Sequence, residues 1–343
     1  MTTQPAREIR ALAFVVAIFL LVPVAAMGQG RTTAADESAV PRTPWGDPDL
    51  QGIWDYWTFT PLERPAEFAD RDVLTAEEAA VVARQSNAEA LARDAPPPPG
   101  QVGGYSQAVW TDRARATALT QPSLLVDPPD GKLPPLTPQA QQRAEAHRAA
   151  GGHPVRLRVG GVSANGPEAR GVSERCVVGF STGPPMLPAG YNNNVQLFQA
   201  PGVVVIFNEM IHDARIVPID EGSHLPDNIR QWRGDPRGRW EGQTLVVEST
   251  NFNGKTAFRG SGADLHLEER FTRVSIGRLL YQFTIDDPKS FTKPWSAVIP
   301  MKATEGPIFE YACHEGNYGM VNLLAGARAQ DAAAAALTTR DPQ

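Results

Sequence analysis

The sequence predicts a mainly β protein, an antiparallel barrel or sandwich with two short helices inserted in its N-terminal half. Three observations support this fold class. From residue 194 onward, short runs rich in β-branched and aromatic residues alternate with turn signals, which is typical of antiparallel sheets. The 343 residues include 30 glycines and 31 prolines, which favours many turns over long helices. Helix-start signals stand out only before residue 152.

The N-terminus has the three parts of a secretory signal peptide, which we assign to residues 1–30. Arg7 and Arg10 precede an apolar run over 11–27, and small residues follow. We expect cleavage near the end of this segment, and hence a periplasmic or secreted protein with no stable membrane span after cleavage. A membrane anchor is the alternative, because about 17 apolar residues is the lower limit for spanning a bilayer. Pro23 near the exit favours cleavage.

Charge and motif content exclude several function classes. The formal net charge is −6 and no block of Lys or Arg interrupts it, so nucleic acid is not expected as a partner. The chain has no G-x-S-x-G elbow, no P-loop and no G-x-G-x-x-G motif. We therefore expect neither a nucleotide cofactor nor a hydrolase of the elbow type, and we assign no cofactor.

Cys176 and Cys313 are the two cysteines of the chain. In an oxidising compartment such a pair most often forms one disulfide. The alternative is a reactive thiol, for which Cys313 beside His314 is the candidate.

The domain organisation follows from composition. We expect a flexible lead-in over 31–44, which is polar and rich in small residues, and one β-rich domain over 45–328. A helical and Pro-rich insertion lies at 74–152 within this domain. The Ala-rich end, 329–343, lacks an apolar stripe and is expected to be disordered.

The insertion contains both predicted helices. Thr75 and Glu78 form a capping box before an Ala-rich run that lasts to about Asp94. Thr137 precedes a proline at the first helical position, and the second helix is expected to end at the glycines 151–152.

Strands are predicted where β-branched and aromatic residues lie between turn signals. Turns are expected at Pro201-Gly202, Asp235-Pro236, 275–277, 286–288 and 305–307. The predicted strands are 53–59, 123–127, two strands within 195–217, then 244–250, 265–274, 278–285, 295–301 and 308–314.

Several stretches resemble a family of uncharacterised exported bacterial proteins. The likeness spans most of the mature chain except 153–173; it implies export and supplies no reaction. A second, shorter likeness is the G-x-W pattern of lipocalin-type barrels at Gly52-Ile53-Trp54, near the start of the expected sheet. The stretches that carry the family likeness are PDLQGIW (48–54), 123–135, ERC (174–176), YNNN (191–194), EMIHDAR (209–215), GRWEGQTLVVE (238–248) and YACHEGNY (311–318).

The predicted strand 203–217 carries the first candidate site. Alternation places Glu209, Asp213 and Arg215 on one face and His212 on the other. If the first face points inward, an Asp–Arg pair and a second carboxylate lie inside the sheet, where burial costs several kcal/mol per charge unless the charges are paired. The alternative is a solvent-facing charged row or an ion pair that fixes register.

The second candidate site surrounds Cys313. A disulfide would fix His314 and Glu315 in place and would bring Tyr191 and Asn192–Asn194 into the same region. A histidine, a carboxylate, a tyrosine and amides in one neighbourhood suit acid–base chemistry on an oxygenated substrate. The alternative for the asparagines is a turn whose side chains bond their own backbone. No paired spacing indicates a metal site, and none is assigned.

These observations predict an exported β-barrel protein with a pocket for a small, largely apolar or aromatic molecule. The alternative is a cofactor-independent extracytoplasmic hydrolase, lyase or isomerase that uses histidine and carboxylate groups. The catalytic candidates are His212, Asp213, Arg215, His314 and Glu315, and the ligand-binding candidates are Tyr191, Asn192, Asn194, Glu209 and Trp240.

Overall fold

The computed structural model describes residues 40–93, 119–149, 166–219, 222–255, 258 and 260–338. The predicted signal peptide, most of the predicted lead-in, the Pro-rich loop and the last five residues lie outside the described residues. The end of the lead-in is not irregular, because Thr43 N donates a hydrogen bond to Asp47 O over 2.9 Å and Arg42 pairs with Pro48.

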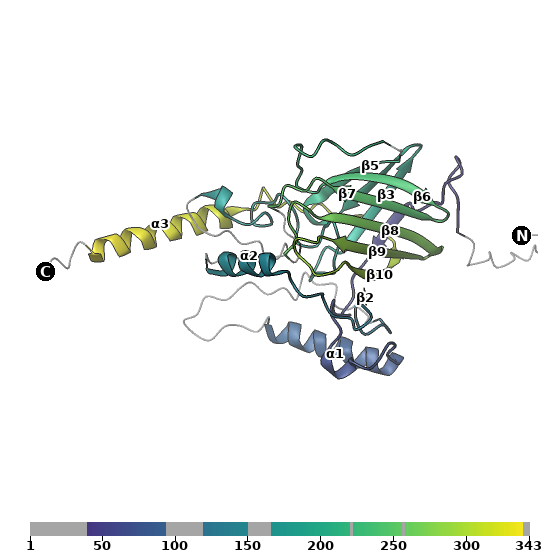
Figure 1. The fold of residues 1–343 in the computed structure, drawn as a ribbon, viewed down its shortest axis with the longest axis horizontal. Helices are drawn as coiled ribbons and strands as arrows, with labels where there is room; N and C mark the ends of the chain where they lie inside the picture. Colours follow the sequence, from purple (N-terminus) through teal and green to yellow (C-terminus); the bar gives the residue numbers. More distant parts are fainter. Residues whose placement is uncertain are drawn as a thin grey trace, which may run out of the picture. The chain divides into compact units, whose positions relative to one another are not determined.

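A ten-stranded antiparallel sheet forms the protein (Figure 1), which confirms the mainly β fold class. The strand order is β5-β4-β3-β1-β10-β9-β8-β7-β6, with β2 paired to β10. The strands are β1 (Gly52–Asp55), β2 (Leu125–Asp127), β3 (Asn194–Ala200), β4 (Val203–Asn208), β5 (Asp213–Pro218), β6 (Asp235–Glu241), β7 (Thr244–Thr250), β8 (His266–Ser275), β9 (Arg278–Asp286) and β10 (Trp295–Thr304).

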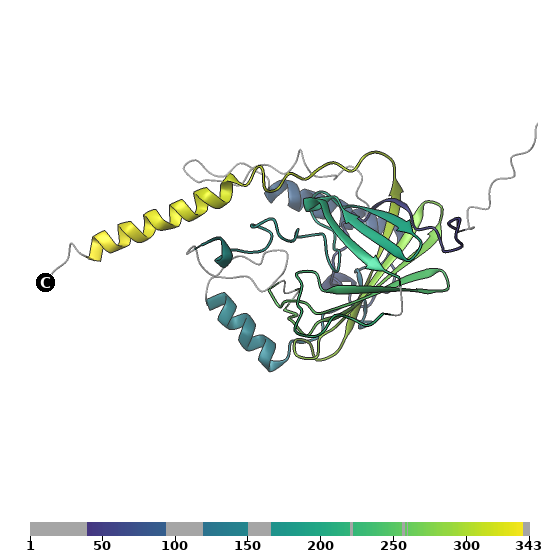
Figure 2. The ribbon, with the colours of Figure 1, turned by 90° about the horizontal axis from the view of Figure 1, so that it is seen from above.

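The sheet curls on itself without closing into a barrel (Figure 2). Arg215 on edge strand β5 bonds Glu269 on β8, although five strands lie between β5 and β8 in the sheet order. The two edges, β5 and β6, share no ladder among the described residues and meet at one isolated bridge between Ile219 and Gly238. A seam therefore remains between β5 and β6.

The inward faces of the strands fill the curled sheet with side chains. Buried positions alternate with partly buried ones along β4 and most of β9, as the period of two requires. Aromatic rings dominate the centre, where Phe283 contacts Trp295 edge to face with 5.6 Å between ring centroids. Trp54 of β1 is fixed by a hydrogen bond from its Nε1 to Leu50 O over 2.9 Å.

The two predicted helices of the insertion are present as α1 (Ala76–Arg93) and α2 (Pro138–Ala149). The capping box is formed as predicted, since Thr75 N donates to Glu78 Oε2 and Glu78 N donates to Thr75 Oγ1. Thr137 Oγ1 caps α2 by accepting from Ala140 N.

The predicted disordered tail needs correction. A third helix, α3 (Tyr318–Thr338), continues through residues 329–338. Alanine has the highest helix propensity, so an Ala-rich run can continue a helix without an apolar stripe.

Three strand predictions also need correction. Residues 308–314 form no strand: Pro307 carries no backbone N–H, and the segment is held instead by the contacts described below. Strand β6 begins where a turn was predicted at Asp235-Pro236. The predicted strand 203–217 is divided into β4 and β5 by a 3₁₀ turn at Met210–His212.

Candidate functional site

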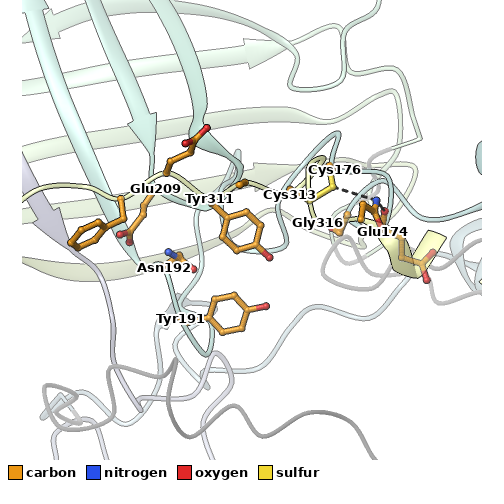
Figure 3. A pocket seen from close by; sticks show the side chains of 13 residues that line it. Glu174, Cys176, Tyr191, Asn192, Glu209, Tyr311, Cys313 and Gly316 are labelled. Atoms are coloured by element: carbon orange, nitrogen blue, oxygen red, sulfur yellow. Dashed lines mark hydrogen bonds between the residues drawn. A yellow bond between two sulfur atoms is a disulfide. The ribbon is translucent and has the colours of Figure 1, made fainter. Parts of the chain in front are cut away.

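A surface pocket of about 1000 Å³ lies beside the disulfide (Figure 3). It brings together three segments that are distant in the sequence: the turn around Cys176, residues 191–209 and the unpaired segment after β10. Its lining residues are Ser173, Glu174, Cys176, Tyr191, Asn192, Glu209, Phe309, Glu310, Tyr311, Ala312, Cys313, Gly316 and Asn317.

The predicted disulfide is present. Cys176 and Cys313 are joined with 5.8 Å between their Cα atoms, and Asn317 Nδ2 adds a hydrogen bond of 2.8 Å to Glu174 O across the same junction. These contacts hold the segment 307–317 against the pocket without any strand pairing. A pocket wall therefore depends on a covalent crosslink.

Aromatic side chains from both the 307–317 segment and residue 191 also form part of the pocket wall. The rings of Tyr191 and Tyr311 are nearly parallel, 12° apart with 6.4 Å between centroids. Phe180 packs edge to face on Tyr191 at 5.4 Å between ring centroids, and Phe309, which lines the pocket, is 69 % exposed. Such rings offer flat apolar surface to a ligand.

Glu209 places a carboxyl group in this pocket at the end of β4. Its Oε2 accepts a hydrogen bond of 2.9 Å from Asn194 Nδ2. Burial raises the pKa of Glu209 above its ordinary value, and hydrogen bonds from Asn194, Asn192 and the Phe309 backbone offset the rise only in part. The pocket thus contains an acid that takes up a proton more readily than an exposed glutamate does.

The backbone is strained around this pocket. Five described residues other than glycine have φ between 42° and 62°: Cys176, Asn192, Ile211, His212 and Asn251. The first two line the pocket, and Ile211 and His212 form the turn that follows Glu209. Left-handed backbone at a β-branched residue such as Ile211 is costly, and strain of this kind concentrates at functional sites.

His212 lies next to the pocket and is exposed, with its Nδ1 at 3.3 Å from Tyr311 O. Asp213, the next residue and the first of β5, is buried. The side-chain contacts described for the two residues are with different partners: Tyr311 O for His212 and Arg233 for Asp213.

The predicted ion pair between Asp213 and Arg215 is wrong, because each of the two residues pairs with a different partner. Arg215 donates to Glu269 through Nη1 at 2.5 Å and Nη2 at 3.0 Å, and Tyr281 Oη donates to Glu269 at 2.6 Å. Asp213 instead pairs with Arg233, whose Nη2 donates to Val177 O. Sequence reasoning missed Glu269 and Arg233, because alternation within one strand says nothing about its partners across the interior.

Arg215, Glu269, Tyr281 and Asp213 form a buried network inside the sheet, and burial and charge together set the pKa values of its members. Burial lowers the pKa of Arg215, but the charge and hydrogen bonds of Glu269, together with the charges of Tyr281 and Asp213, raise it above its ordinary value. Burial first, and the Glu269 charge second, raise the pKa of Tyr281 well above its ordinary value. Burial also raises the pKa of Asp213, against the opposing effect of Arg233. The network therefore holds Arg215 charged and Tyr281 protonated at neutral pH.

The remaining predicted residues lie outside the pocket. His314 and Glu315 are exposed in the turn after Cys313 and are not part of the lining. Trp240 packs against the hydrophobic core from β6. Phe309 and Tyr311 were not singled out from the sequence; the second lies in the stretch YACHEGNY, which was the available signal.

No group of three or more His, Cys, Asp or Glu side chains within the described residues is placed to hold a metal ion. No helix in that part of the chain is both long and apolar enough to cross a membrane.

The fold and the pocket together define the class of protein: it is mainly β and has a surface pocket with a disulfide in its wall. Comparison with protein-family models and with curated protein sequences returned no match. Membership in the exported bacterial family therefore stays a prediction from sequence resemblance.

Proposed function

We propose that the protein binds a small molecule with an apolar or aromatic body in the pocket beside the disulfide. The observation that carries this proposal is the combination of Tyr191, Phe309 and Tyr311 with the buried carboxyl of Glu209 in one cavity of about 1000 Å³. Ligand pockets are commonly apolar with a few placed polar groups. The filled interior of the sheet is a poorer candidate, because aromatic side chains occupy it.

The polar side chains that line the pocket beside the disulfide indicate which class of ligand it would bind. Glu174 and Glu209 both accept hydrogen bonds within the protein, but Glu174 is exposed whereas Glu209 is buried in the pocket, so we assign Glu209 as the carboxyl that orients a ligand. A carboxyl with a raised pKa suits a neutral ligand that carries a hydroxyl or an amide. Burial of the aromatic part supplies affinity, and Glu209 and Asn192 supply orientation.

Native mass spectrometry and a fluorescent probe test the binding proposal. Protein purified with its disulfide intact is expected to retain a small molecule, and to enhance the fluorescence of the neutral aromatic probe N-phenyl-1-naphthylamine. Tyr311→Ala should weaken probe binding, whereas Phe198→Ala should not, because Phe198 is exposed on the outer face of β3. Equal binding by both variants would contradict the assigned pocket.

A catalytic role is the second candidate, and the raised pKa of Glu209 is the observation that favours it. An acid tuned upward by burial suits proton transfer near neutral pH. In this case Glu209→Gln should abolish turnover of a substrate while probe binding persists, and His212→Ala should reduce it. A variant with full activity would exclude Glu209 as the acid–base group.

We also propose that the protein works outside the cytoplasm after cleavage of residues 1–30, which the disulfide supports. The intact mass of protein from the periplasm or medium should correspond to a chain that begins close to residue 31. A chain that keeps its first residues and sediments with membranes would contradict this.

A further inference from the structure

A second pocket, of about 570 Å³, lies at the seam between the edge strands β5 and β6. Its walls come from Ala214, Arg215, Ile216 and Pro218 on β5, from Asp235 and Pro236 on β6, and from the segment 230–234 that leads into β6. Arg215, whose side chain is otherwise buried, is among the residues that line this pocket. No part of this pocket is shared with the pocket beside the disulfide.

Three of the lining residues are arginines, Arg215, Arg230 and Arg233. The three guanidinium groups differ in whether a carboxylate neutralises them. Arg215 and Arg233 pair with Glu269 and Asp213, whereas the described contact of Arg230 is a hydrogen bond of 2.6 Å from Nη1 to the backbone oxygen of Ala263. A carbonyl oxygen accepts a hydrogen bond but does not neutralise the guanidinium charge.

Asp235 is the one acidic residue among the described lining, and its carboxylate is already engaged. Its Oδ2 accepts from Leu225 N at 2.9 Å and lies 3.1 Å from His224 Nδ1. Arg237 Nε approaches the same oxygen at 3.7 Å. The positive charge of the seam is therefore not balanced by Asp235.

Arg215 supplies an independent indication of a ligand. Its side chain is 3 % exposed, yet its Nε atom has no hydrogen-bond partner in the structure. A buried donor without a partner is unfavourable and is normally satisfied by protein, water or ligand. In this position the missing acceptor can come from the pocket that Arg215 lines.

We propose that the seam between β5 and β6 binds a small anion through a carboxylate or a phosphate group. Arginine forks match the geometry of both groups. Arg230 at the exposed mouth receives the anion, and the Nε donor of Arg215 lies deeper. The ring of Trp232, which is covered in part by Arg175 at 5.8 Å, borders the site and can contact the remainder of an organic anion.

Isothermal titration of the disulfide-bonded protein with benzoate and, separately, with inorganic phosphate tests the proposal. We expect one site per chain for at least one anion, with affinity that falls as sodium chloride is added. Binding of benzoate alone assigns a carboxylate ligand, and binding of phosphate alone assigns a phosphate group. Binding of neither anion in the millimolar range would overturn the proposal.

Arg230→Gln is the deciding variant, because Arg230 is exposed and its loss should not prevent folding. It should weaken anion binding by about tenfold or more, the effect of one charge-assisted hydrogen bond. Arg278→Gln, at an exposed position on β9, is the matched control and should bind normally. Equal affinity in both variants would overturn the seam assignment, whatever the result for the naphthylamine probe.

Discussion

The interaction partners of single residues in this protein depend more on which side chains are buried together than on the pattern of the local sequence. Glu269 is fully buried on β8, and its two oxygens are satisfied by Arg215 and Tyr281. Removing one charge of such a pair leaves the other without compensation. Glu268, the next residue along the strand, faces outward and takes part in a surface ion-pair network.

Glu269→Gln should therefore lower the free energy of unfolding by about 3–5 kcal/mol, since it leaves a buried guanidinium without its counter-charge. Glu268→Gln should cost less than about 1 kcal/mol, because exposed ion pairs contribute little. Urea unfolding of both variants measures the difference. Equal costs would mean that Glu269 is not the charge that balances Arg215.

Glu209 should make stability depend on pH. Its pKa is raised in the folded state by burial, so its contribution to stability is present below the unfolded-state pKa of about 4.3 and is lost as pH rises through the folded-state pKa. In the variant Glu209→Gln no carboxyl group ionises at this position, so this loss of stability with rising pH does not occur. The variant should be more stable than the wild type at pH 7, and the gap should narrow toward pH 4.

Unfolding free energies of both proteins across this range are the measurement. Glu310→Gln is the control, because Glu310 lines the same pocket at an exposed position. A wild-type protein that gains stability between pH 4 and pH 7 relative to Glu209→Gln would reverse the assigned direction. A stabilised variant that has lost binding would show that the pocket is maintained at a cost to stability.

At the scale of elements, local signals predicted α1, α2 and most strands, but not α3. The capping box at Thr75 and the cap at Thr137 satisfy backbone donors within a few residues, so the sequence contains all the information needed. The segment 308–314 has strand composition, but a strand also needs a partner edge, which composition cannot reveal. The turn at Ile211 was missed for a related reason, because tertiary contacts hold a β-branched residue in a conformation it rarely adopts.

The seam between β5 and β6 depends on Gly238. A Cβ atom there would lie 2.4 Å from Ile219 Cδ1 and 2.9 Å from Val217 Cγ1. Gly238→Ala should force the two edge strands apart and cost about 1–3 kcal/mol, the usual effect of overpacking. Gly277→Ala is the matched control, since a Cβ there meets no atom within 4 Å. Thermal unfolding of both variants checks the difference.

At the scale of the whole molecule, the pairing of the two cysteines could be predicted because the chain offers no other pair. The pocket that they enclose could be predicted only in part: Tyr191 and Asn192 were expected near the disulfide and line its pocket. His314 and Glu315 follow Cys313 directly but point to solvent. Residues next to a cysteine in the sequence lie near its disulfide, but the course of the backbone decides which of their side chains face the pocket.

The disulfide closes a separation of 137 residues, so its loss should be costly. A variant with Cys176→Ser and Cys313→Ser should lose about 2–5 kcal/mol, chiefly because the unfolded chain gains freedom. Probe binding should fall further than stability alone explains, since segment 307–317 has no strand partner to hold it. Probe titration under conditions where the variant is folded separates the two effects, and unchanged binding would contradict the role of the crosslink.

The strand order has a consequence for how the protein is made. Strand β1 lies in the middle of the sheet and pairs with both β3 and β10, so that Ile53 meets Thr304. A growing chain therefore cannot complete this sheet until almost all of it has been synthesised, and contacts so remote in sequence form slowly. During that interval the nascent polypeptide exposes unpaired strand edges. Such a chain would need protection from association until its last strand has been synthesised.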